Sequence, residues 1–150
     1  MAQAKKINPD GGNLYERAND MFVKVTAEDT SGAYEVCEER CPAGFASRPH
    51  MHVQNHETFF VIEGSATFLM GENDTYEGKP GDLFHIPPGV PHQMIAGDDG
   101  VRVLMVYSPG ETEAMFKDMT ALTPEQRADF ETGREVAARH NTVWVENFRQ

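Results

Sequence analysis

Short apolar stretches separated by turn-forming residues run through most of this 150-residue chain. Residues 33–41 (AYEVCEERC) alternate apolar and charged side chains, as a strand with one buried face does. Residues 101–107 (VRVLMVY) are almost continuously apolar, which indicates a more deeply buried strand. Residues 97–100 (GDDG) are predicted to form a turn. This rhythm predicts an all-β sandwich or barrel. The other strand candidates are residues 21–26, 57–63, 65–70, 83–86 and 90–96.

The pattern becomes helical near the C-terminus. Residues 111–119 are one helix candidate, and residues 123–140 are a second, opened by the capping sequence TPEQ. Asn141 is expected to cap the end of that helix. The segment around Trp144 is expected to add an edge strand or to pack on the barrel. We interpret this region as a structural brace or lid with no chemistry of its own.

The chain therefore divides into a central barrel with an extension at each end. Residues 1–30 are expected to form an N-terminal arm with a first strand, loose up to about residue 20 and available for exchange in a dimer. Residues 31–109 form the barrel, and residues 110–150 form the C-terminal helices and tail.

Charge and composition limit the classes of molecule that this protein is expected to bind. The net charge of −11 repels nucleic acid phosphates and anionic lipids, so neither nucleic acid nor a membrane is expected as a partner. An anionic substrate stays open, because a local metal charge can override the global field. Cys37 and Cys41 would lie about 13 Å apart along a strand, too far for a disulfide. Reduced thiols and the absence of an apolar leader predict a cytoplasmic protein.

Two stretches carry the candidate chemistry, residues 44–64 and 81–96. His50 and His52 are two residues apart in a strand and therefore face the same side. Glu57 follows on the next strand, and a rigid Gly/Pro turn precedes His92. Each residue alone would be ordinary. Together, three imidazoles and a carboxylate suit a divalent first-row transition metal, which would also compensate a carboxylate placed among apolar neighbours.

The walls of the pocket can be predicted from strand parity. Phe59 and Val61 share the parity of Glu57, and Met94 shares that of His92, so these apolar side chains are expected to contact substrate. Arg48 shares the parity of His50 and is expected either at the pocket mouth, where it would meet an anionic group, or on the surface. The histidines at positions 56, 85 and 140 are interpreted as structural or surface residues.

These two stretches resemble the conserved motifs of the cupin family. The first motif, G(X)5HXH(X)4E(X)6G, is matched at every defined position, and the second, G(X)5PXG(X)2H(X)3N, is matched except that Ala96 replaces the final Asn. The resemblance implies a small double-stranded β-helix, a jelly-roll barrel, with one metal ion bound by His50, His52, Glu57 and His92. It also implies a homodimer, because cupins of this layout often exchange strands near the N-terminus. The matched positions are Gly44, His50, His52, Glu57, Gly64, Gly81, Pro87, Gly89 and His92.

Within the cupins, the strings VIEG and IPPGVPH and the helical tail resemble the quercetin dioxygenase-like group. That resemblance implies a dioxygenase acting on a small enolisable or aromatic substrate, such as a flavonol or polyketide, with Glu57 taking the substrate proton. A lyase, isomerase or cyclase that needs no oxygen is the first alternative, and a non-enzymatic module that binds a small ligand is the second. The donor set accepts Fe, Ni, Mn, Co, Cu or Zn.

Overall fold

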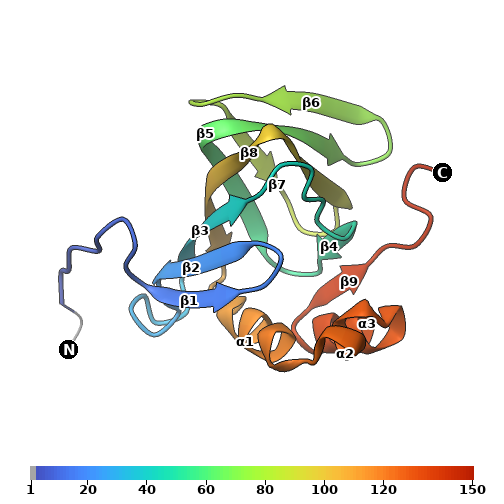
Figure 1. The fold of residues 1–150 in the computed structure, drawn as a ribbon. Helices are drawn as coiled ribbons and strands as arrows, with labels where there is room; N and C mark the ends of the chain where they lie inside the picture. The colour runs from blue at the N-terminus through green and yellow to red at the C-terminus, as the bar shows by residue number, and fades with distance from the viewer. Residues whose placement is uncertain (1–2) are drawn as a thin grey trace.

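The computed structural model describes residues 3–150 as a curled β-barrel with helices along one side (Figure 1). The strands are β1 (Asn13–Glu16), β2 (Asp20–Val25), β3 (Glu35–Cys41), β4 (His50–His52), β5 (His56–Met70), β6 (Asp74–Gly78), β7 (Leu83–Ile86), β8 (His92–Ser108) and β9 (Thr142–Trp144). The helices are α1 (Glu113–Ala121), α2 (Pro124–Ala128) and α3 (Phe130–Arg139). The predicted fold class, a jelly-roll barrel with a helical C-terminal extension, is confirmed. No helix within the described residues has both the length and the apolar character needed to cross a membrane.

Two long strands, β5 and β8, hold the barrel together by pairing along most of their length. In one half of the barrel, β8 also pairs with β3 and β5 with β7. In the other half, β8 also pairs with β4 and β5 with β6. The prediction that β5 and β8 would each be two shorter strands is wrong, and residues 97–100 do not form a turn but belong to β8. The chain bends at Gly64 and Gly100, both at positive φ, while strand pairing continues through local register shifts. A side chain at Gly64 would collide with the backbone of Gly100.

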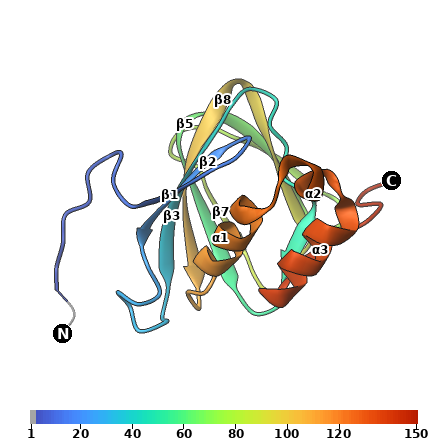
Figure 2. The ribbon, with the colours of Figure 1, turned by 60° about the horizontal axis from the view of Figure 1, so that its bottom comes forward.

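The N-terminal region is more ordered than expected. Residues 13–16 form β1, which pairs antiparallel with β2, and β2 pairs with β3. The expectation of a loose arm up to about residue 20 is therefore wrong, because these strands extend the barrel sheet of their own chain (Figure 2).

The C-terminal helices differ from the prediction at one point. The capping box formed by Thr123 and Gln126 is confirmed. The single helix expected over residues 123–140 is wrong, because Asp129 is extended and its side chain accepts a hydrogen bond from the Thr132 backbone, which starts α3. The C-cap of that helix is His140, one residue earlier than the predicted Asn141, and Asn141 follows it at a φ of +56°.

Buried contacts attach the helices to the barrel. The carboxylate of Glu35 on β3 accepts a hydrogen bond of 2.7 Å from the Thr112 backbone N–H, at the start of α1. On the opposite side, β9 pairs with β4 as an edge strand, which confirms that part of the tail prediction. Cys37 and Cys41 are free and buried, also as expected.

Candidate metal centre

The four predicted donor residues meet inside the barrel. His50 and His52 lie on β4, Glu57 is the second residue of β5, and His92 opens β8, where it pairs directly with His50. One potential ligand atom from each residue lies within 4.8 Å of the other three. Strand pairing therefore joins residues that are 42 positions apart in the chain, from His50 to His92, into one cluster that could hold a metal ion.

Each imidazole is held by a contact at Nδ1. His50 Nδ1 lies 2.7 Å from the Arg48 carbonyl oxygen, and His92 Nδ1 lies 2.9 Å from the Val90 carbonyl oxygen. Because a carbonyl can only accept, both nitrogens carry the proton. His52 Nδ1 lies 3.2 Å from the hydroxyl of Thr142, which donates to another backbone carbonyl and so accepts from the ring. The Nε2 atoms of neutral rings held in this way have lone pairs available for a metal.

The interior of the cluster contains more acceptors than donors. Glu57 Oε2 lies 3.0 Å from His52 Nε2 and 2.9 Å from His92 Nε2. His52 Nε2 is buried and, although close to the carboxylate, has no hydrogen-bond partner with acceptable geometry among the described residues. Lone pairs that converge on a buried carboxylate repel one another unless a cation lies between them. The residues present therefore fit a divalent metal.

The charges within the cluster agree with this. Burial lowers the pKa of His50 to about 3, helped by the charges of His92 and His52, so this ring is neutral at physiological pH. Burial alone would raise the pKa of Glu57, but His52 and His92 hold it well below its usual range. For His92 the directions are reversed: burial alone would lower its pKa, but the adjacent Glu57 carboxylate raises it. A proton on His92 would therefore compete with a metal ion for this ring.

The cluster opens into a cavity of about 390 Å³. Phe59, Met94 and Arg48 line this cavity. Val61 does not line it, contrary to expectation. It has the predicted inward parity but pairs with Val103 deeper in the barrel, where it is fully buried in the apolar core.

Several cavity residues were not anticipated. Tyr107 pairs with Glu57 across the strands, and its ring packs against His52 at a centroid distance of 5.5 Å. Glu39 has the same parity as the buried Cys37 and Cys41, which was an available signal of its inward direction. Arg17 and Arg127 also line the cavity, but they come from distant segments and nothing in the local sequence marks them.

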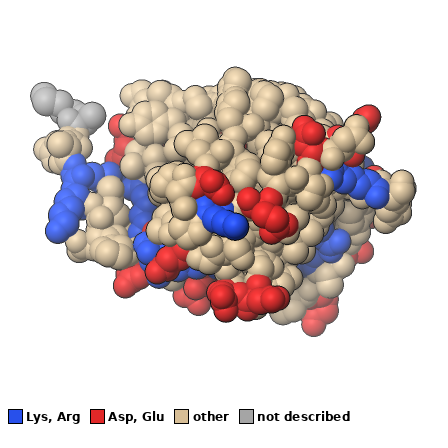
Figure 3. All heavy atoms as spheres, turned by 90° about the horizontal axis from the view of Figure 1, so that it is seen from above, with Lys and Arg blue, Asp and Glu red and all other residues tan. Residues whose placement is uncertain are grey.

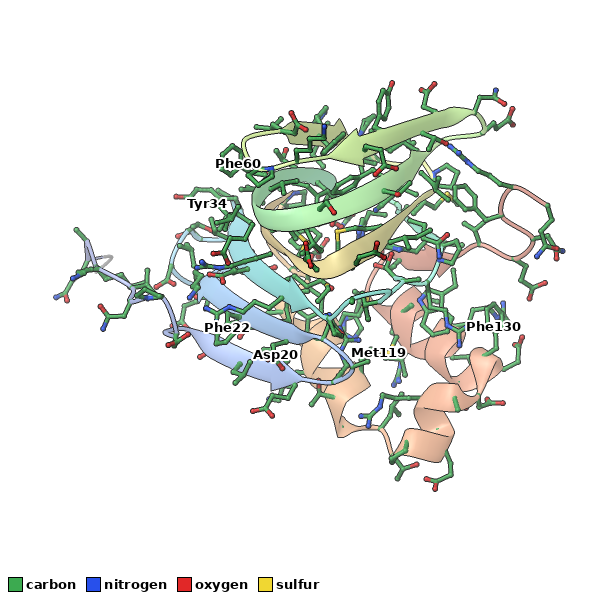
Figure 4. The ribbon with its side chains drawn as sticks, turned by 45° about the horizontal axis from the view of Figure 1, so that its top comes forward. Asp20, Phe22, Tyr34, Phe60, Met119 and Phe130 are labelled. Atoms are coloured by element: carbon green, nitrogen blue, oxygen red, sulfur yellow. The ribbon has the colours of Figure 1, made fainter. Side chains whose placement is uncertain are left out.

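The helices are more than a brace, because they form one wall of the cavity. Met115, Phe116 and Met119 of α1 and Trp144 of β9 line it beside the barrel residues. Met119 lies where α1 faces the β1–β2 hairpin (Figure 4). His56 and His85, in contrast, are exposed and stack on each other outside the cluster at a centroid distance of 5.5 Å.

Comparison with known proteins defines the family. Residues 38–107 match the model of the Cupin domain. The chain is 30% identical over 114 residues to the uncharacterized protein MJ1618 of Methanocaldococcus jannaschii, covering 73% of this chain and 86% of that protein. It is 33% identical over 111 residues to the uncharacterized protein SCO3923 of Streptomyces coelicolor, covering 73% of this chain and 91% of that protein. The chain belongs to the cupin family.

A solved structure has the same fold. KdgF from Halomonas sp. superposes with a TM-score of 0.64 at 17% identity, covering 73% of this chain and 98% of that one. At this identity the likeness concerns the fold alone.

Proposed function

We propose that this protein is a metal-dependent cupin enzyme, and that it is a dioxygenase acting on a small enolisable or aromatic substrate, as in the quercetin dioxygenase-like group. The observation that carries the proposal is the buried convergence of His50, His52, Glu57 and His92 at one end of a cavity large enough for a small molecule. The metal would be Fe, Ni, Mn, Co, Cu or Zn, since three imidazoles and one carboxylate accept any of these.

The chain's own residues have distinct parts in this proposal. A bound metal would supply Lewis acidity, which makes a coordinated hydroxyl or a neighbouring C–H more acidic. In this proposal Glu57 takes that proton, because its carboxylate lies among the donor atoms and is ionised there. Phe59, Met94 and Phe116 line the cavity with apolar surface, which excludes water and favours a flat apolar substrate body.

A second candidate is a lyase, isomerase or cyclase that uses no oxygen. The observation that favours it is a second carboxyl in the same cavity, Glu39, whose burial raises its pKa to about 6. A carboxyl that titrates near neutrality can both give and take a proton, as non-oxidative eliminations and isomerisations require.

The metal site is tested by replacing the donors. His50→Ala and His92→Ala should each reduce the metal content, measured by elemental analysis of the purified protein, from about one ion per chain to a small fraction. His85→Ala is the matched control, because His85 is exposed and lies outside the cluster. Full metal content in both donor variants would overturn the site.

The reaction is tested on protein loaded with each candidate metal. Oxygen uptake with flavonols and related enolisable compounds is the expected result. Turnover of the same compounds under strict anaerobiosis would instead support the non-oxidative candidate. Binding without turnover under either condition, across all the metals, would overturn both enzymatic assignments.

A further inference from the structure

A second charged group lines the same cavity, formed by Arg17, Glu39 and Arg127. Arg17 follows β1 in the turn to β2, Glu39 lies on β3 and Arg127 on α2. Figures 1 and 2 show the β1–β2 hairpin beside the helices. Three segments far apart in the chain therefore contribute charge to one cavity.

Arg17 is half-buried, and its guanidinium lacks the partner that a buried nitrogen normally has. Its Nε atom is inaccessible to solvent and has no hydrogen-bond partner within residues 3–150. Glu39 lines the same cavity but forms no ion pair with Arg17, and it instead accepts a hydrogen bond of 2.5 Å from the Asn19 side chain. An unpaired buried donor of this kind is costly unless a ligand satisfies it.

Arg127 is oriented by the end of α1. Its Nη1 donates to the carbonyl oxygens of Leu122, at 2.8 Å, and Thr120, at 3.3 Å. Its remaining N–H groups make no hydrogen bond within the described part of the chain. Both guanidinium groups line the same cavity, and the charge of Arg127 adds to burial in lowering the pKa of Arg17. Two cations brought together in this way indicate a place for an anion.

The cavity differs in charge from the molecule around it. The chain carries a net charge of −11, yet the cavity wall contains three arginines and two glutamates. On the face seen in Figure 3, acidic and basic side chains are both spread among uncharged atoms, and basic ones also lie beside the N-terminal segment. An arginine-rich cavity in an acidic protein favours entry and binding of an anion.

We propose that the substrate is an organic carboxylate whose carboxylate group is bound by Arg17 and Arg127, with its reactive end toward His50, His52, Glu57 and His92. This inference rests on the proposed function, because it names the substrate class for the same site. Two arginines beside ionised Glu39 leave one positive charge, which a monoanion balances. The apolar side chains of Met115, Phe116 and Met119 favour an apolar middle in that molecule.

The test uses three catechols that differ only at the end remote from the metal-binding hydroxyls: 3,4-dihydroxyphenylacetate, its amide and 4-methylcatechol. Binding to the zinc-loaded protein is measured by calorimetry and by the fluorescence of Trp144, the only tryptophan, which lines the cavity. The acid should bind at least about tenfold more tightly than the amide, the difference expected for a charge-assisted hydrogen-bonded pair. Equal affinities would overturn the proposal.

Variants assign the preference to the two arginines. Arg17→Gln and Arg127→Gln should each weaken binding of the acid about tenfold and leave the amide within about threefold. Arg139→Gln is the matched control, because Arg139 is exposed on α3 and does not line the cavity. Arg17→Lys keeps the charge and should retain part of the preference. If acid and amide lose affinity equally in folded variants, as judged by circular dichroism, the arginines only support the cavity and the proposal is wrong.

A parallel measurement separates this inference from the proposed function. Metal-free protein is titrated with phenylacetate and with phenylacetamide, neither of which needs a metal. A preference for phenylacetate in a protein that takes up no metal would overturn the metal-dependent function and support the anion site. A protein that binds one metal ion but does not distinguish acid from amide would overturn the anion site and support the metal-dependent function.

Discussion

At the residue scale, Thr142 is the side chain that fixes the orientation of a metal donor from outside the cluster. Its hydroxyl lies 3.2 Å from His52 Nδ1, and Thr142 is only 2% exposed. Thr142→Val keeps the shape and removes that contact, so we expect metal affinity to fall about tenfold, as for other contacts that orient metal ligands. Competition with a chromogenic chelator measures the change. Thr67→Val, on the outer side of β5, is the control, and equal affinities in the two variants would contradict the role of Thr142.

A second prediction at this scale concerns Glu39 and pH. Burial raises its pKa to about 6, above the ordinary value, although Arg17 opposes the rise. The folded state therefore holds this proton more tightly than the unfolded state, and stability falls as the pH rises from about 4.5 to about 6.5. Glu39→Gln should remove this loss, making the metal-free variant up to about 2 kcal/mol more stable than wild type at pH 7.5. The gain should vanish at pH 4.

Urea unfolding at the two pH values measures the effect. Glu63→Gln is the matched control, because the side chain of Glu63 is 73% exposed. A Glu39→Gln variant less stable than wild type at pH 7.5 would show that the attraction between Glu39 and Arg17 outweighs the cost of burying the charge.

At the element scale, the packing of α3 on β9 depends on a glycine. A methyl group at Gly133 would lie 2.7 Å from Cζ3 of Trp144, so alanine cannot be accommodated without movement. Alanine gains about 1 kcal/mol in helix propensity, but overpacking costs about 1–3 kcal/mol, so Gly133→Ala should be destabilising by about 1 kcal/mol. Urea unfolding followed by circular dichroism measures this. In the Trp144→Phe background, whose smaller ring lacks the outer indole atoms that face Gly133, the same substitution should become neutral or stabilising, and an unchanged penalty there would refute the contact.

The same scale explains which elements could be predicted from the sequence. The four metal donors could be predicted because His50, His52 and Glu57 lie in one short stretch, and strand parity gives their direction. The continuity of β5 and β8 through the bends at Gly64 and Gly100 could not be predicted. In the local sequence, a glycine within a bulge cannot be distinguished from a glycine that ends a strand. The break at Asp129 was missed because its capping role competes with a continuous helical pattern.

At the scale of the whole molecule, the cavity exists only when three parts of the chain come together. The β1–β2 hairpin contributes Arg17, the barrel contributes the metal donors, and the C-terminal elements contribute Arg127 and Trp144. No local pattern records such distant convergence, and for this reason the sequence identified the metal donors but not Arg17 and Arg127. The C-terminal extension, interpreted from sequence as a brace, thereby becomes part of the binding site.

The homodimer expected from the cupin resemblance is also a prediction at this scale. We propose that it forms through β1, which pairs on one side only within the described residues and exposes 43% of Leu14. Light scattering should give twice the chain mass of 16.7 kDa. Leu14→Lys should shift the protein toward the monomer, because a charge on an edge strand opposes edge-to-edge pairing. Leu83→Lys is the control, since Leu83 is 61% exposed on β7, at a different edge. A monomeric wild type, or a Leu14→Lys variant that stays dimeric, would exclude this interface.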